Sequence, residues 1–134
     1  MRLLTEIMLV AVGSAFGGLA RWGVGTVAGR WLGTSMPWGT FVVNITGCFF
    51  LGWLLTMLTD RFAPHETYWI RPDHVRLALG VGFTGAYTTF STLGWEAHGL
   101  LRDGGGWLGF GYVIASVVLG LVALRLGVEL ARAF

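Results

Sequence analysis

The sequence predicts an all-α integral membrane protein with four membrane-spanning helices. Three observations lead to this fold class. Of the 134 residues, 54% are hydrophobic and only 12% are charged, and the apolar residues gather in long stretches. A soluble domain has roughly 25% charged residues, and a spanning helix needs about 20 mostly apolar ones. Because no linker or shift in composition divides the chain, we expect residues 1–134 to form a single membrane domain.

Four apolar stretches are long enough to span a bilayer. They are Leu3–Thr26, Trp38–Leu58, Val75–Leu101 and Trp107–Ala131. Residues 28–37 carry an arginine, glycines and a proline, which suits a short connection. Residues 59–74 carry mixed charges and two prolines, which suits a solvated loop, and residues 102–106 suit a tight turn. Four spans place both termini on the same side of the membrane.

The third apolar stretch contains a polar interruption. Its run Gly82–Thr92 holds two glycines and five Ser or Thr hydroxyls in otherwise hydrophobic sequence. Inside a membrane, a non-helical backbone is tolerated only where it is buried in protein or lines a polar cavity. The third span is therefore predicted to be a broken helix, and this break is the first candidate for a functional site.

Polar side chains also fall within the first two predicted spans. Asn44 lies near the middle of the second span, one turn after Thr40, so their side chains project from one face. The amide suits either an interhelical hydrogen bond or donation to a dehydrated anion. Arg21 either anchors the first span at the interface or places a positive charge at the mouth of an ion pathway.

The last predicted span carries a polar stripe. Tyr112, Ser116 and Gly120 follow one another at intervals of four and share one face. This stripe fits either a helix contact or a polar track along a pore. Glu96, just beyond the break, is the carboxylate that stands out within the spans, since Glu6 and Glu129 lie near the chain ends.

Several classes of function are disfavoured by the composition. Cys48 is the only cysteine, so the chain has no intrachain disulfide and no cysteine-based metal cage. The histidines lack metal-ligand spacing, and no G-x-S-x-G or H-E-x-x-H motif occurs. The arginines are scattered, which argues against a nucleic-acid partner. We therefore expect that the chain is not an enzyme.

Small residues recur four positions apart along the predicted helices. Such pairs let helix backbones approach closely in lipid, either within one subunit or between subunits. Because four short helices enclose little polar volume, a homo-oligomer is the expected way to build a pathway. The pairs are Gly13 with Gly17, Gly25 with Gly29, Ala78 with Gly82, Ser116 with Gly120, and Ala123 with Gly127.

Together these residues resemble the Fluc family of fluoride channels, also called CrcB proteins. The matching motifs cover all but the last quarter of the chain. They are Gly17–Trp22 in the first span, Gly39-Thr40 with Val43-Asn44 and Gly47 in the second, and Gly82–Thr92 with Glu96 in the third.

The resemblance implies a fluoride-selective passive channel that exports cytoplasmic fluoride and so reduces its toxicity. It also implies a dual-topology homodimer, with two copies inserted antiparallel in the bacterial inner membrane, and fluoride and lipid as further partners. The distribution of arginines, taken alone, favours a single orientation with the termini inside, because most lie on the side of the termini.

The resemblance further assigns residues by motif position. A structural Na⁺ at the dimer centre would be bound by the backbone carbonyls of Gly85 and Thr88. Arg21 and Glu96 would line a vestibule. Leu93 stands where the family has a second phenylalanine, which is a departure from its pattern. The fluoride pathway would comprise Thr40, Asn44, Phe90, Ser91, Thr92, Tyr112 and Ser116.

Two other classes of function are kept as alternatives. A small four-span exporter of cationic drugs would need a deep carboxylate in the first span, which this sequence lacks. A non-transporting membrane subunit would use its glycine-rich faces to bind a partner protein.

Overall fold

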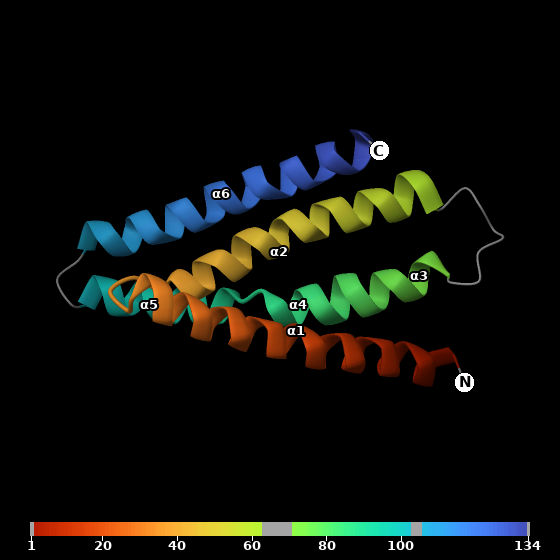
Figure 1. The fold of residues 1–134 in the computed structure, drawn as a ribbon, viewed down its shortest axis with the longest axis horizontal. Helices are drawn as coiled ribbons and strands as arrows, with labels where there is room; N and C mark the ends of the chain where they lie inside the picture. The colour runs from red at the N-terminus through yellow and green to blue at the C-terminus, as the bar shows by residue number, and fades with distance from the viewer. Residues whose placement is uncertain (1, 63–70, 103–105, 134) are drawn as a thin grey trace.

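The computed structural model describes residues 2–62, 71–102 and 106–133, and these residues are almost entirely helical. The helices run along a common long axis, and both ends of the chain lie at the same end of the bundle (Figure 1). The arrangement of the termini is the one expected from the sequence. The all-helical fold class is confirmed.

Three helices in the described part of the chain are long and apolar enough to cross a membrane. These spans are Arg2–Leu32, Trp38–Asp60 and Gly106–Ala133. The first is α1 (Arg2–Leu32), and the second is α2 (Trp38–Met57) extended by the π-helix η1 (Leu58–Phe62). The third is α6 (Gly106–Ala133). The predicted third span is not among them, because no single helix covers it.

The first connection is shorter than predicted. We expected it to begin at residue 28, but α1 continues to Leu32 and ends at Gly33, whose φ is +81°. A glycine inside a helix costs only about 1 kcal/mol relative to alanine, so Gly25 and Gly29 do not end α1. Gly33 does end it, because only glycine adopts a positive φ readily.

The predicted long loop over residues 59–74 is helical at both ends. At its start, η1 continues α2 to Phe62, and at its end α3 (Pro72–Val75) begins with a proline. Proline is tolerated at a first helical position because that N–H has no intrahelical partner. Residues 63–70 of this loop, and residues 103–105 of the predicted last turn, lie outside the described residues.

The predicted break in the third segment is observed. From α3 the chain passes into the π-helix η2 (Arg76–Thr84) and α4 (Gly85–Tyr87). Thr88 is then extended, with φ −85° and ψ 159°, before α5 (Phe90–Arg102) begins. Both glycines of this run have a helical backbone conformation. The residue that interrupts the helix is therefore Thr88, and not a glycine.

Several glycines allow helices to contact one another closely. A Cβ at Gly13 or Gly17 would overlap backbone atoms of Ala78 or Phe83, so α1 and η2 touch backbone to backbone. Around Gly29, by contrast, the structure leaves open space for a Cβ. Most of the predicted small-residue pairs therefore serve packing within one chain.

Candidate functional site

Asn44 of α2 pairs with the backbone that the helix break leaves exposed. The Thr89 N–H donates to Asn44 Oδ1 at 2.8 Å, and Asn44 Nδ2 donates to the Thr89 carbonyl at 3.0 Å. A buried backbone group without a partner is costly, and here one side-chain amide serves both groups of Thr89. Since an amide nitrogen carries two N–H groups, one donor of Asn44 remains for another acceptor.

Thr89 also caps the helix that follows the break. Its Oγ1 accepts the N–H of Thr92 at 3.2 Å, which is the hydrogen bond of an N-cap residue. The same oxygen donates to Thr92 Oγ1 at 3.0 Å and lies 3.2 Å from Ser91 Oγ. Because Thr92 accepts here, its own hydroxyl hydrogen remains to be donated. The predicted pathway residues Ser91 and Thr92 thus lie at the positive end of α5.

The Glu96 carboxylate joins two other predicted site residues. Thr40 Oγ1 donates to Glu96 Oε1 at 2.8 Å, and the Tyr112 hydroxyl donates to Glu96 Oε2 at 2.9 Å. Ser116 Oγ donates to the Tyr112 carbonyl at 2.7 Å. The structure brings these four predicted residues together, and the hydroxyl hydrogens of Thr40, Tyr112 and Ser116 are directed to acceptors within the chain.

Three recesses near the break share residues of their walls. The first, about 500 Å³, is lined by Thr40 and Glu96 beside residues 33–37. The second, about 370 Å³, is also lined by Thr40 and extends to Thr89. The third, about 250 Å³, is lined by Thr89, Asn44 and Ser116. The first and second recesses therefore share the hydroxyl-bearing Thr40, and the second and third share Thr89.

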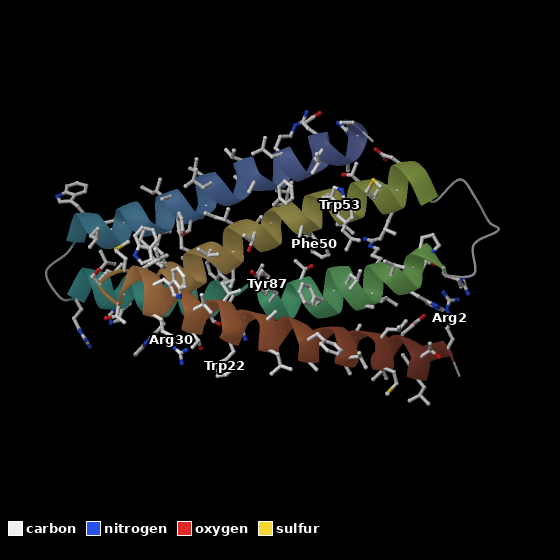
Figure 2. The ribbon with its side chains drawn as sticks, viewed as in Figure 1. Arg2, Trp22, Arg30, Phe50, Trp53 and Tyr87 are labelled. Atoms are coloured by element: carbon white, nitrogen blue, oxygen red, sulfur yellow. The ribbon has the colours of Figure 1, made fainter. Side chains whose placement is uncertain are left out.

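The second recess holds a positive charge. Its lining includes Arg21, Thr92 and no carboxylate. Arg21 Nη1 lies 3.5 Å from the Thr88 carbonyl, so the guanidinium reaches the break from α1. The next residue, Trp22, lies on the outer side of α1 (Figure 2). A cation in a recess bounded by apolar helices raises the local concentration of anions.

Phe90 and Leu93 of α5 differ in burial on the single chain. Phe90 is 82% exposed on the single chain, whereas Leu93 is 5% exposed and packs with Ala97 and Tyr112. Both residues line the third recess. The residue that departs from the family pattern therefore has a packing role between α5 and α6.

Two residues of this site were not among the predicted pathway residues. Thr89 is the N-cap of α5, and a threonine just before a helical run is a signal that would have identified it. Gly47 faces the break, because a Cβ there would overlap the Thr88 methyl group. A small residue one turn from Asn44 indicates a close approach of another backbone, but not which backbone approaches.

Comparison with known proteins agrees with the resemblance. Residues 8–128 match the family described as "CrcB-like protein, Camphor Resistance (CrcB)". The fluoride-specific ion channel FluC of Solibacter usitatus is 46% identical over 127 residues, covering 95% of this chain and 98% of that protein. FluC of Chloroflexus aurantiacus is 40% identical over 131 residues, covering 98% of each chain.

A third relative, FluC of Dehalococcoides mccartyi, is 38% identical over 125 residues, covering 93% of this chain and 91% of its own. All three relatives are named as ion channels, which agrees with the prediction that the chain is not an enzyme. With a match over most of its length and relatives of similar length, this chain belongs to the CrcB family.

Proposed function

We propose that the chain forms a multi-pass channel through which cytoplasmic fluoride leaves a bacterial cell passively across the inner membrane. The observation that carries this proposal is the set of three neighbouring recesses that share Thr40 and Thr89 in their walls, with Asn44 in the wall of the third. The relatives named above are fluoride-specific ion channels, which supports the same conclusion.

A pathway for fluoride must replace the water that the ion loses. Removing a small anion from water is costly unless donors take the place of its hydration shell. In the second recess, the Thr92 hydroxyl hydrogen, the N-terminus of α5 and the Arg21 guanidinium supply positive charge. In the third recess the remaining N–H of Asn44 supplies the next donor.

Glu96 has a separate task at the entrance. It accepts hydrogen bonds from Tyr112 and from Thr40, which lines both of the first two recesses, so it fixes both hydroxyls. In this proposal the Thr40 hydroxyl breaks its hydrogen bond to Glu96 and donates to an entering fluoride. The Thr40–Glu96 hydrogen bond forms again once the ion has passed. The entrance thereby binds the ion transiently, which conduction requires.

The proposal includes the whole predicted assembly, with the broken segment as a fourth membrane crossing. A second copy, inserted in the opposite orientation, is proposed to cover Phe90. The exposure of this ring on the single chain supports the idea. The edge of an aromatic ring is electropositive, so Phe90 stabilises an anion once another wall encloses it.

The proposal also includes Na⁺ between the two copies, held by the carbonyls of Gly85 and Thr88. Since the Thr89 N–H turns to Asn44, it does not pair with the Gly85 carbonyl four residues earlier. In the residues that the structure describes, no group of three or more His, Cys, Asp or Glu could hold a metal. Backbone carbonyls freed by a broken helix are suitable ligands for such an ion, whose charge would hold two breaks together.

The cation can be tested without measuring transport. Exchanging Na⁺ for the large cation N-methyl-D-glucamine is expected to lower the thermal stability of the detergent-solubilised dimer, because the ion stabilises only the folded assembly. Light scattering during a thermal ramp measures this change. Equal stability in both cations would remove Na⁺ from the proposal.

Efflux from liposomes tests the proposed function. Purified protein is reconstituted into vesicles loaded with potassium fluoride or potassium chloride, and ion-selective electrodes follow release. We expect fluoride release that depends on valinomycin, because a passive anion channel needs a compensating cation current, and we expect chloride to be retained. Fluoride release no faster than from protein-free vesicles would refute the channel. Proton-driven uptake of a cationic dye would favour the drug exporter instead.

A further inference from the structure

The helix break contacts α2 at three successive residues. Within Tyr87–Thr89, the first residue meets Thr46, the second lies against Gly47, and the third pairs with Asn44. One short stretch of α2, residues 44–47, therefore contacts all three residues of the break. The contact at Thr89 belongs to the proposed fluoride pathway. The contact at Tyr87 lies outside the residues of that pathway.

Thr46 and Tyr87 form a directed hydrogen bond. Their hydroxyl oxygens are 2.9 Å apart, and Thr46 Oγ1 is also 2.7 Å from the Val42 carbonyl. A hydroxyl has one hydrogen, and a carbonyl can only accept, so Thr46 donates to Val42. The Tyr87 hydroxyl must then be the donor to Thr46. The Tyr87 side chain is thereby tied to a fixed oxygen on α2.

Ring contacts hold the Tyr87 side chain from its other side. Its ring stacks on Phe83 with centroids 5.7 Å apart and an interplanar angle of 11°. Phe83 meets Phe50 edge to face at 5.9 Å, and Phe50 lies 6.1 Å from Trp53. Tyr87 lies near the middle of the long axis of the bundle, with Phe50 and Trp53 farther along α2 (Figure 2). The tyrosine hydroxyl is therefore fixed relative to both α2 and η2.

We infer that Thr46 and Tyr87 are positioning residues that set the fluoride donors at the helix break. The inference rests on the proposed function. Arg21 and Gly47 contact Thr88. The Asn44–Thr89 pair ties the break to α2 by hydrogen bonds at Thr89. The Thr46–Tyr87 hydrogen bond holds Tyr87, the residue before Thr88. The extended Thr88 therefore lies between two hydrogen-bonded residues, Tyr87 and Thr89. The capping hydroxyl of Thr89 and the donors of α5 follow directly in the chain.

Two single variants remove this bond from either side. Tyr87→Phe deletes the donor, and Thr46→Val deletes the acceptor with almost no change of volume. We expect each to lower the fluoride-to-chloride flux ratio of folded, reconstituted protein about threefold to tenfold, the range that one hydrogen bond inside a protein or membrane supports. Flux is normalised to the dimer recovered by size-exclusion chromatography.

The double variant separates positioning from stability. Each single variant leaves one hydroxyl without its partner and should lower thermal stability. Replacing both hydroxyls with apolar groups should recover much of that stability, because neither side then lacks a hydrogen bond. The flux ratio of the double variant should nevertheless stay reduced, because the tie between Tyr87 and Thr46 is still missing.

Matched controls use the same chemical changes. Thr46→Ser keeps the hydroxyl and should keep the wild-type flux ratio. Thr26→Val removes another hydroxyl that donates to the carbonyl four residues earlier, Trp22, and should also leave the ratio unchanged. If the double variant regains the wild-type ratio, or if both single variants keep it, the pair has no positioning role. Failure of the wild-type protein to pass fluoride would instead refute the proposed function.

Discussion

The two sides of α2 make contacts of opposite character. Toward α6 the contact is close packing of backbone: a Cβ at Gly52 would overlap the backbone of Leu124, and one at Gly127 would overlap that of Phe49. Toward the break, Asn44 and Thr46 form hydrogen bonds. A continuous helix satisfies its own backbone, so only close packing is needed against it. A broken helix needs the side chains of a neighbour, and these same groups can serve an ion.

The strongest way to break this comparison is to remove the amide of Asn44. Asn44→Ala leaves both backbone groups of Thr89 unpaired, at about 1–3 kcal/mol each. Fluoride flux should fall by about tenfold or more, measured as efflux per folded dimer. Asn44→Asp keeps an acceptor for the Thr89 N–H but repels fluoride, so flux should fall sharply while the dimer remains. Undiminished flux in both would remove Asn44 from the pathway.

Substitutions in the close-packed contact between α2 and α6 should lower stability and leave fluoride flux per folded dimer unchanged. Gly52→Ala forces the backbones of α2 and α6 apart, and overpacking of this kind costs about 1–3 kcal/mol. We expect less folded protein and lower thermal stability, but unchanged flux per folded dimer. Gly111→Ala is the control, because a Cβ there meets open space. A selective loss of flux in Gly52→Ala, with normal stability, would contradict the division of α2 into two sides.

A smaller effect is expected at Phe90. Phe90→Ile keeps an apolar side chain but removes the electropositive ring edge. Because this ring is exposed on the single chain, the change should leave the stability of the chain nearly unaffected and reduce fluoride flux several-fold. Efflux together with a thermal ramp checks both parts. A loss of stability without a loss of flux would assign Phe90 to packing instead.

The smallest effect is expected at Arg21. Arg21→Gln removes the cation from the second recess, so flux should fall a few-fold at low ionic strength. Because salt screens a partly exposed charge, the difference from wild type should shrink as an inert salt is added. A difference that is independent of salt would indicate that Arg21 acts through the Thr88 carbonyl rather than through its charge.

The sequence was sufficient to predict the helical class, the break and the polar residues around it. It failed where a helix end depends on one dihedral angle: α1 ends at Gly33 rather than before Ala28. The sequence also indicated the glycines as part of the reason for the break. In the structure Gly82 packs against α1, and Thr88 is the extended residue. Spacing reveals that a backbone approaches closely, but the neighbour that approaches is known only once the helices are arranged.

Predicting the direction of hydrogen bonds was also beyond the sequence. Thr40 and Tyr112 were predicted as residues of the pathway, and in the structure both donate to Glu96. For Asn44 the sequence allowed either an interhelical hydrogen bond or donation to an anion, and in the structure its oxygen and one of its two N–H groups pair with Thr89. A polar residue inside a membrane must find partners, and residue type alone does not say whether they belong to the protein or to an ion.

The central claim is that this chain conducts fluoride passively and selectively, and a reversal potential tests it most directly. Protein is incorporated into a planar bilayer with different fluoride concentrations on the two sides and equal chloride. The account predicts a current that reverses at the equilibrium potential of fluoride. A current that reverses at zero voltage, or no current above that of the bare bilayer, would contradict it.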